Sequence, residues 1–124
     1  MVTLENAEIQ MRKGILELCV LRVIANEEVY ASDLLYHLKE AHLLVVEGTL
    51  YPLLNRLTKS GLVTYSWQES TGGPPRKYYR LTDNGHGFLQ ELTNSWHQLV
   101  FSATTVLKNT EKSNQEQEMR KQAS

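Results

Sequence analysis

Leucines recur at helical spacing in the middle of the chain. They are Leu50, Leu53, Leu54 and Leu57. Residues three and four positions apart share one side of an α-helix, so this side should be buried and the opposite side should face solvent. The pattern predicts a helix that begins near Glu47. Two residues depart from helix rules: Val46 has no side-chain oxygen to cap the first turn, and Pro52 lacks a backbone donor inside the helix.

After this helix, the spacing of the apolar residues changes from the three to four of a helix to the two of a strand, which predicts a β-hairpin. Gly61 can adopt the left-handed conformation that ends a helix. Apolar and polar residues then alternate over residues 63–68, which is typical of a half-buried strand. A second strand is expected over residues 77–81, KYYRL. The intervening ESTGGPPR, residues 69–76, contains two glycines and two prolines and predicts a loop that neither strand enters.

Two more helices are expected before the leucine-rich one. Apolar residues on more than one side predict a helix over about residues 7–25 at the centre of a core, with residues 1–6 as a short arm or as its start. Residues 29–30 are expected to form a very short strand. A further helix should open at Ala31 or Ser32 and end near Ala41. Its buried stripe is expected to contain Leu34, Leu35 and Leu38.

The last helix is predicted to carry a seam for pairing. Thr82 can cap a helix that starts at Asp83. Apolar residues then follow the seven-residue repeat of helices that pair along a seam. They are Leu89, Leu92, Trp96, Leu99, Ala103 and Val106. The length of this seam predicts a two-fold homodimer interface; the alternative is that the seam packs only on its own domain.

The middle of the chain resembles the PadR family of bacterial transcriptional regulators. The resemblance is carried by GTLYPLLNRL at Gly48 to Leu57, SGLV at Ser60 to Val63, and RKYYRLTDNG at Arg76 to Gly85. It implies a mainly α fold with a small β-hairpin (α+β), in which a winged helix-turn-helix precedes a long C-terminal dimerisation helix. Residues 1–81 would form the DNA-binding region, residues 82–108 the dimerisation helix and residues 109–124 a polar tail.

Overall charge gives little indication of function, but its distribution does. The 124 residues carry a net charge of −1. From Thr49 to Leu81, however, the five cations Arg56, Lys59, Arg76, Lys77 and Arg80 outnumber the single anion Glu69. This local surplus favours a polyanionic partner, whereas a module that binds protein would more often present an apolar or mixed-charge surface on the third helix.

Other function classes find less support in the sequence. The chain has no nucleophile motif and no glycine-rich phosphate loop, and its four histidines are scattered, so we expect no enzyme, no catalytic residue, no cofactor and no metal site. No apolar run reaches the ~18 residues of a membrane helix, and no signal peptide is evident, which predicts a cytoplasmic protein with no membrane partner. The only cysteine, Cys19, lies in an apolar segment and is expected to be a buried, inert thiol.

The resemblance implies which side chains meet double-stranded DNA. With the leucines turned inward, the polar side of the third helix would enter the major groove, and the cations of the wing would meet the DNA backbone or the minor groove. The expected contacts are Thr49, Tyr51, Asn55, Arg56 and Lys59 on the helix and Arg76 and Lys77 on the wing. Asn55 can read adenine, and Arg56 can read guanine or hold a phosphate.

The expected function is a sequence-specific DNA-binding regulator. A homodimer would present two recognition helices to an inverted-repeat operator, and repression is the mode that the resemblance implies. Trp96, in the middle of the seam, could stack on a small aromatic or apolar effector, or it could simply fill the interface. The alternative function is a winged-helix module that binds protein and not DNA, because a fold does not dictate its function.

Overall fold

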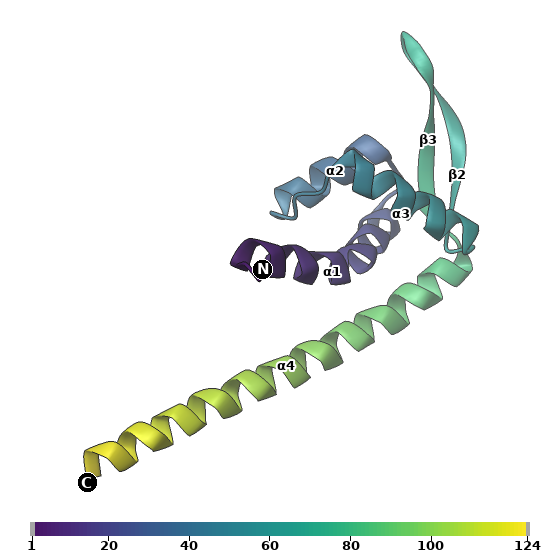
Figure 1. The fold of residues 1–124 in the computed structure, drawn as a ribbon. Helices are drawn as coiled ribbons and strands as arrows, with labels where there is room; N and C mark the ends of the chain where they lie inside the picture. Colours follow the sequence, from purple (N-terminus) through teal and green to yellow (C-terminus); the bar gives the residue numbers. More distant parts are fainter. Residues whose placement is uncertain (1, 124) are drawn as a thin grey trace. The chain divides into compact units, whose positions relative to one another are not determined.

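The computed structural model describes residues 2–123, with side chains except at residues 110–112. Its elements are, in order, α1 (Leu4–Asn26), β1 (Val29–Tyr30), α2 (Ala31–Glu40), α3 (Glu47–Lys59), β2 (Val63–Ser70), β3 (Gly73–Leu81) and α4 (Asp83–Ala123) (Figure 1). This order confirms the predicted fold class, mainly α with a small antiparallel sheet. The chain divides into two compact units within α4, one that ends at Gln90 and one that begins at Glu91.

Helix α1 starts at Leu4, so Leu4, Glu5 and Asn6 of the expected arm belong to it. Thr3 caps it, because the Thr3 hydroxyl oxygen accepts a hydrogen bond from the Asn6 amide at 3.1 Å. Its fully buried residues are Val20, Leu21 and Ile24. The other apolar residues between Ile15 and Val23 are half-buried, so in this single chain the helix contributes to the core without being fully enclosed at its centre as predicted. Cys19 is among them, and burial raises the pKa of its thiol, which therefore stays protonated near neutral pH.

The short strand and the second helix form as predicted. In β1, Val29 pairs with Tyr79 and Tyr30 with Tyr78, so β3 lies between β1 and β2 in the sheet. The amide of Tyr30 donates to the carboxylate of Asp33 at 3.1 Å across the start of α2. Helix α2 buries Ala31, Leu34 and Leu38, whereas Leu35 is only half-buried.

Helix α3 is anchored by its leucines, as the sequence predicted. Leu50, Leu53, Leu54 and Leu57 are all buried. The helix begins at Glu47 without a side-chain cap from Val46, and it accommodates Pro52 in its second turn. At its end Gly61 has a φ of 77°, and the amide of Leu62 donates to the carbonyl of Leu57 at 3.1 Å.

The hairpin is longer than predicted, because both strands continue into the expected loop. β2 reaches Ser70 and β3 starts at Gly73, so only Thr71 and Gly72 form the turn, with Gly72 at a φ of 78°. The prolines enter β3 at a register shift, where Gln68 pairs with Arg76 and Ser70 pairs with Gly73. The hydrogen-bond ladder is interrupted at a bulge, and proline has no backbone N–H to donate to it. The register shift can therefore accommodate Pro74 and Pro75.

Helix α4 begins against the end of the third helix. As predicted, Thr82 caps it: the Thr82 hydroxyl oxygen accepts from the amide of Gly85 at 2.9 Å, and the hydroxyl also donates to the carbonyl of Gly61 at 2.6 Å. The helix continues to Ala123 and so includes the described part of the polar tail. Among the described residues, no helix combines the length and the apolar character needed to cross a membrane.

Candidate nucleic-acid interface

The polar side of α3 is exposed along its whole length. Thr49, Tyr51, Asn55, Arg56 and Lys59 all have exposed side chains. They are exposed because the four leucines occupy the opposite side of the helix and fix its rotation against the core. The helix therefore presents hydrogen-bonding groups outward on a rigid, buried support.

The exposed residues of α3 fall on two flanks. Tyr51 and Asn55 line a depression that faces the hairpin, together with Arg76 and Lys77 of β3. Thr49 and Arg56 line a second depression that faces α1. Lys59 lies exposed in the last turn of the helix. The structure thus brings two of the five predicted helix residues together with both predicted wing residues.

The α1 flank contains an ion pair that sequence reasoning did not foresee. A guanidinium nitrogen of Arg56 lies 3.8 Å from a carboxylate oxygen of Glu17. The Arg56 side chain is 65% exposed, so water screens the pair and it contributes little to stability. Arg56 can therefore exchange Glu17 for an external acceptor at small cost.

The wing cations rest on aromatic rings. The Arg76 guanidinium carbon lies 4.7 Å from the ring centroid of Tyr30, and the Lys77 ammonium lies 4.4 Å from that of Tyr65 and 5.6 Å from that of Trp67. Cation–π contacts of this kind restrict long side chains without neutralising their charge. Both cations are therefore held partly in place beside α3.

Three residues near these cations were not predicted as part of the site. Tyr30, Ser32 and Trp67 line the same depression as Tyr51 and Asn55. Trp67 is 62% exposed, although strand alternation placed it on the half-buried face. The reason is that the hairpin projects beyond the three helices that precede it, so its outer half has no core to cover it (Figure 1). The alternation of apolar and polar residues predicts which side chains share one face of a strand. It does not predict how much of that face the core covers.

The depression beside the wing carries positive charge only. No acidic side chain lines it. Burial raises the pKa of the Tyr79 phenol at its floor, and the neighbouring Tyr51 and Tyr65 raise it further, so this hydroxyl stays neutral at physiological pH. Arg76 and Lys77 therefore set its charge.

The seam residues of α4 differ in their burial. Leu89 is buried and Leu92 half-buried, whereas Trp96, Leu99, Ala103 and Val106 are exposed. Trp96 is 36% exposed and Leu99 is 63% exposed. Within the part of the chain that the structure describes, no three His, Cys, Asp or Glu side chains gather as metal ligands would.

Comparison with known proteins places this fold among transcriptional regulators. Residues 20–91 match the Transcriptional regulator PadR-like family. A PadR-like transcription factor of Bacteroides fragilis is 53% identical, and the match covers 82% of this chain and 98% of that one with a TM-score of 0.70. A transcriptional regulator of Mycobacterium tuberculosis is 34% identical over 66% of this chain and 76% of its own length. Bacillus subtilis PadR, solved in complex with operator DNA, is 24% identical and shares the fold, with a TM-score of 0.60 over 64% of this chain and 46% of that one.

Proposed function

Because the chain belongs to the PadR-like family of transcriptional regulators, we propose that it binds double-stranded DNA in a sequence-specific manner through α3 and the β2–β3 wing. The observation that carries this proposal is the depression in which Tyr51 and Asn55 of α3 lie beside Arg76 and Lys77 of β3. A helix that offers hydrogen-bonding side chains next to fixed cations suits a major groove bordered by phosphates.

The base-reading role belongs in this proposal to the exposed side of α3. The amide of Asn55 has the donor and acceptor needed to bind adenine with two hydrogen bonds. Arg56 reads guanine or holds a phosphate after it leaves Glu17, and Lys59 neutralises backbone charge at the end of the helix. Thr49 and Tyr51 offer hydroxyl groups on the two flanks.

The wing holds the flanking backbone in this proposal. Arg76 and Lys77 carry charge without an acidic neighbour in their depression, and their aromatic supports keep both of them close to α3. Phosphate contacts of this kind position a protein on the duplex and carry no direct sequence information. They should therefore contribute to affinity for every duplex.

The functional species is proposed to be a homodimer joined through α4. Its interface would consist of Leu89, Leu92, Trp96, Leu99, Ala103 and Val106. Most of this seam is exposed in the single chain, and burial of apolar surface contributes about 25 cal/mol per Å². Two recognition helices related by a two-fold axis then suit an inverted-repeat operator, where the bound dimer would act as a repressor by obstructing transcription.

Relief of repression is proposed to involve Trp96. An indole ring at a two-fold interface lies near its symmetry mate, and a flat aromatic or apolar effector can stack between the two rings. Such an effector changes DNA affinity only as far as it favours one arrangement of the dimer over another. The partial exposure of the Trp96 side chain is compatible with access for a ligand.

Salt dependence tests DNA binding against the alternative of a protein-binding module. We expect affinity for a short duplex to fall steeply between about 50 and 200 mM salt, because each neutralised phosphate releases counterions. The measurement is fluorescence anisotropy of a labelled duplex, with a duplex obtained by selection from a random pool compared with its scrambled form. An absence of binding to either duplex at low salt would favour the protein-binding module.

A further inference from the structure

An acidic side chain lies beside one of the residues proposed to contact DNA. Glu17 of α1 pairs with Arg56, which is in the last turn of α3. Among the described residues that line the depression on this flank, Glu17 is the one acid, and Lys13 and Arg56 are the cations. A carboxylate in this place repels the phosphates of any duplex, so by itself it opposes DNA binding.

The ion pair is weak in the free protein and becomes stronger at an interface. The side chains of Arg56 and Glu17 are 65% and 37% exposed, so water screens their attraction and the pair adds little to stability. A duplex that docks on this flank displaces part of that water, and the attraction grows as the local dielectric constant falls. Glu17 therefore acts on Arg56 mainly when DNA is bound.

Arg56 keeps donors available while it is paired. Its Nη2 atom lies 3.8 Å from Oε2 of Glu17. This separation is too long for a hydrogen bond, so the pair is held by charge alone. A guanidinium has several N–H donors in a planar fork, and those of Arg56 can still be donated to a further acceptor.

The two acceptors considered for Arg56 differ in how they respond to Glu17. A phosphate is an anion, so a phosphate that draws Arg56 away from Glu17 replaces one anion with another and adds little affinity. A guanine edge is neutral and accepts two hydrogen bonds from the fork, at O6 and N7. Arg56 can donate these bonds while its charge stays beside Glu17. The carboxylate therefore favours the base over the backbone.

We propose that Glu17 is a positioning residue that makes Arg56 a reader of guanine. It holds the guanidinium on the α1 flank and offsets the charge that would draw it to any phosphate. Duplexes without guanine at this place are then penalised more than the preferred one, which raises specificity at some cost in affinity. This inference rests on the proposed function and extends it by assigning one base contact and the residue that enforces it.

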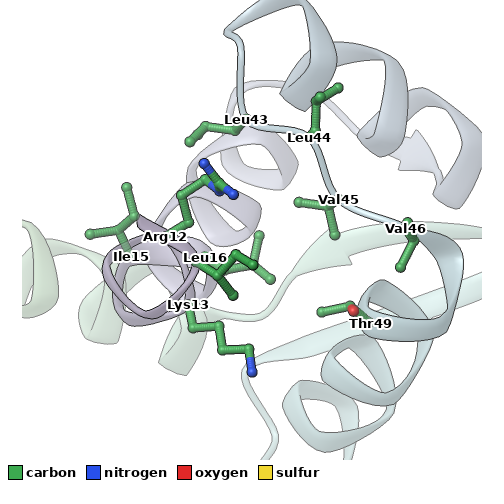
Figure 2. Close-up of a pocket in the computed structure, with 10 residues that line it drawn as sticks. Arg12, Lys13, Ile15, Leu16, Leu43, Leu44, Val45, Val46 and Thr49 are labelled. Atoms are coloured by element: carbon green, nitrogen blue, oxygen red, sulfur yellow. The ribbon is translucent and has the colours of Figure 1, made fainter. Parts of the chain in front are cut away.

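Glu8 provides a matched control on the same helix. It pairs with Arg12 at 3.9 Å, and both side chains are 44% exposed. Arg12 extends from α1 toward Leu43 of the α2–α3 connection, whereas Lys13 extends on the side of Thr49 in α3 (Figure 2). Glu8→Gln therefore removes the same charge from α1 as Glu17→Gln does, but away from the α1 flank of the third helix.

Anisotropy titrations with the selected duplex and its scrambled form test the proposal. In Glu17→Gln, affinity for the selected duplex should fall about threefold and affinity for the scrambled duplex should rise about threefold, so their ratio falls about tenfold. Binding of the scrambled duplex should also become more salt-dependent, by about one unit of slope, because Arg56 gains a phosphate. Glu8→Gln should leave the ratio unchanged.

Base replacement in the selected duplex locates the contact. Each G·C pair is replaced in turn by A·T, and the pair read by Arg56 is the one whose replacement weakens binding of the original chain but not of Arg56→Gln. Glu17→Gln should lose most of the discrimination at this same pair. In the background of Arg56→Gln, Glu17→Gln should not change the affinity ratio further, since Glu17 acts through Arg56.

Arg56→Lys gives a test that does not depend on the stability of Glu17→Gln. Lysine keeps the charge but lacks the planar fork, so this variant should lose discrimination at the same G·C pair and retain its affinity for the scrambled duplex. Arg56 is exposed, so the substitution leaves the core intact. Thermal unfolding curves verify that each variant is folded.

The possible results separate this inference from the proposed function. Specific binding with the same affinity ratio in Glu17→Gln as in the original chain overturns the role of Glu17 and leaves the proposed function standing. A selected duplex in which no G·C pair depends on Arg56 overturns the guanine contact. If the original chain binds no duplex at low salt, the proposed function and this inference both fail.

Discussion

Gly85 is a residue whose small size the fold requires. It lies in the first turn of α4, and a Cβ atom built at this position would overlap the backbone carbonyl oxygen of Leu62. Backbone atoms cannot rotate aside as a side chain can, so the first turn of α4 or the end of the α3 region would have to move. The same carbonyl accepts a hydrogen bond from the amide of Thr82 at 3.1 Å, which ties the two segments together.

We therefore predict that Gly85→Ala lowers the free energy of unfolding by about 2 kcal/mol or more, as overpacking does elsewhere. Gly87→Ala is the matched control, because no atom other than those of its chain neighbours and its own helix backbone lies within 4 Å of a Cβ built there, and alanine favours the helix by roughly 0.5–1 kcal/mol. Urea unfolding followed by circular dichroism, at one protein concentration, measures both. Equal effects of the two substitutions would contradict the close approach.

Asn55 should contribute to sequence-specific DNA binding, whereas the wing cations Arg76 and Lys77 should contribute to the binding of any duplex. Asn55→Ala should weaken binding to the preferred operator by roughly 1–3 kcal/mol and hardly change binding to a scrambled duplex, because only base contacts carry sequence information.

Arg76→Ala/Lys77→Ala should weaken binding to the operator and to the scrambled duplex alike. It should also reduce the salt dependence of binding, by about one unit of slope for each lost phosphate contact. Anisotropy titrations on both duplexes over a range of salt concentrations measure these effects, and unchanged affinities in both variants would remove the proposed recognition surface.

At the scale of elements, the ends of the helices could be predicted from nearby residues, whereas the tip of the hairpin could not. The buried side of α3, the glycine turn at Gly61 and the cap at Thr82 were all predicted, because each depends on residues within a few positions of one another. The hairpin tip was not, because the pairing of β2 with β3 and its bulge decided where the prolines lie. Loop residues were inferred from composition, whereas strand ends depend on a partner strand.

The start of α3 offers a test at this scale. Val46 precedes the helix with an extended backbone, φ −90° and ψ 155°, and makes no side-chain cap. Val46→Ser should raise the free energy of unfolding by about 1 kcal/mol relative to Val46→Ala, because serine can accept a hydrogen bond from a free amide of the first turn. Urea unfolding of the two variants gives this difference. A serine variant no more stable than the alanine variant would show that the first turn does not form as described.

At the scale of the whole molecule, the exposed seam of α4 is the feature that a single chain does not explain. The seven-residue repeat continues past the end of the first compact unit, and from Trp96 onward its described apolar residues are exposed. Paired helices bury such repeats against each other. The proposed homodimer would bury these side chains.

Trp96→Asp should convert the proposed dimer to monomers, since it places an unpaired charge in the proposed apolar interface. Phe101→Asp is the control: Phe101 is 74% exposed and lies outside the repeat of seam residues, so this variant should remain dimeric. Sedimentation velocity over a range of protein concentrations distinguishes the two species. A dimeric Trp96→Asp variant, or a Phe101→Asp variant that dissociates equally, would count against the proposed seam.

The sequence by itself determined the helices, the short strand, the cap at Thr82 and the polar side of α3. These follow from periodicity and from the preferences of residues close together in the chain, such as the leucines from Leu50 to Leu57. Only the tertiary structure decided that Tyr51 and Asn55 lie beside Arg76 and Lys77, that Arg56 pairs with Glu17, and that Trp67 is exposed. Those relations join residues far apart in the chain, and they depend on how the hairpin and α1 pack around α3, which no local pattern encodes.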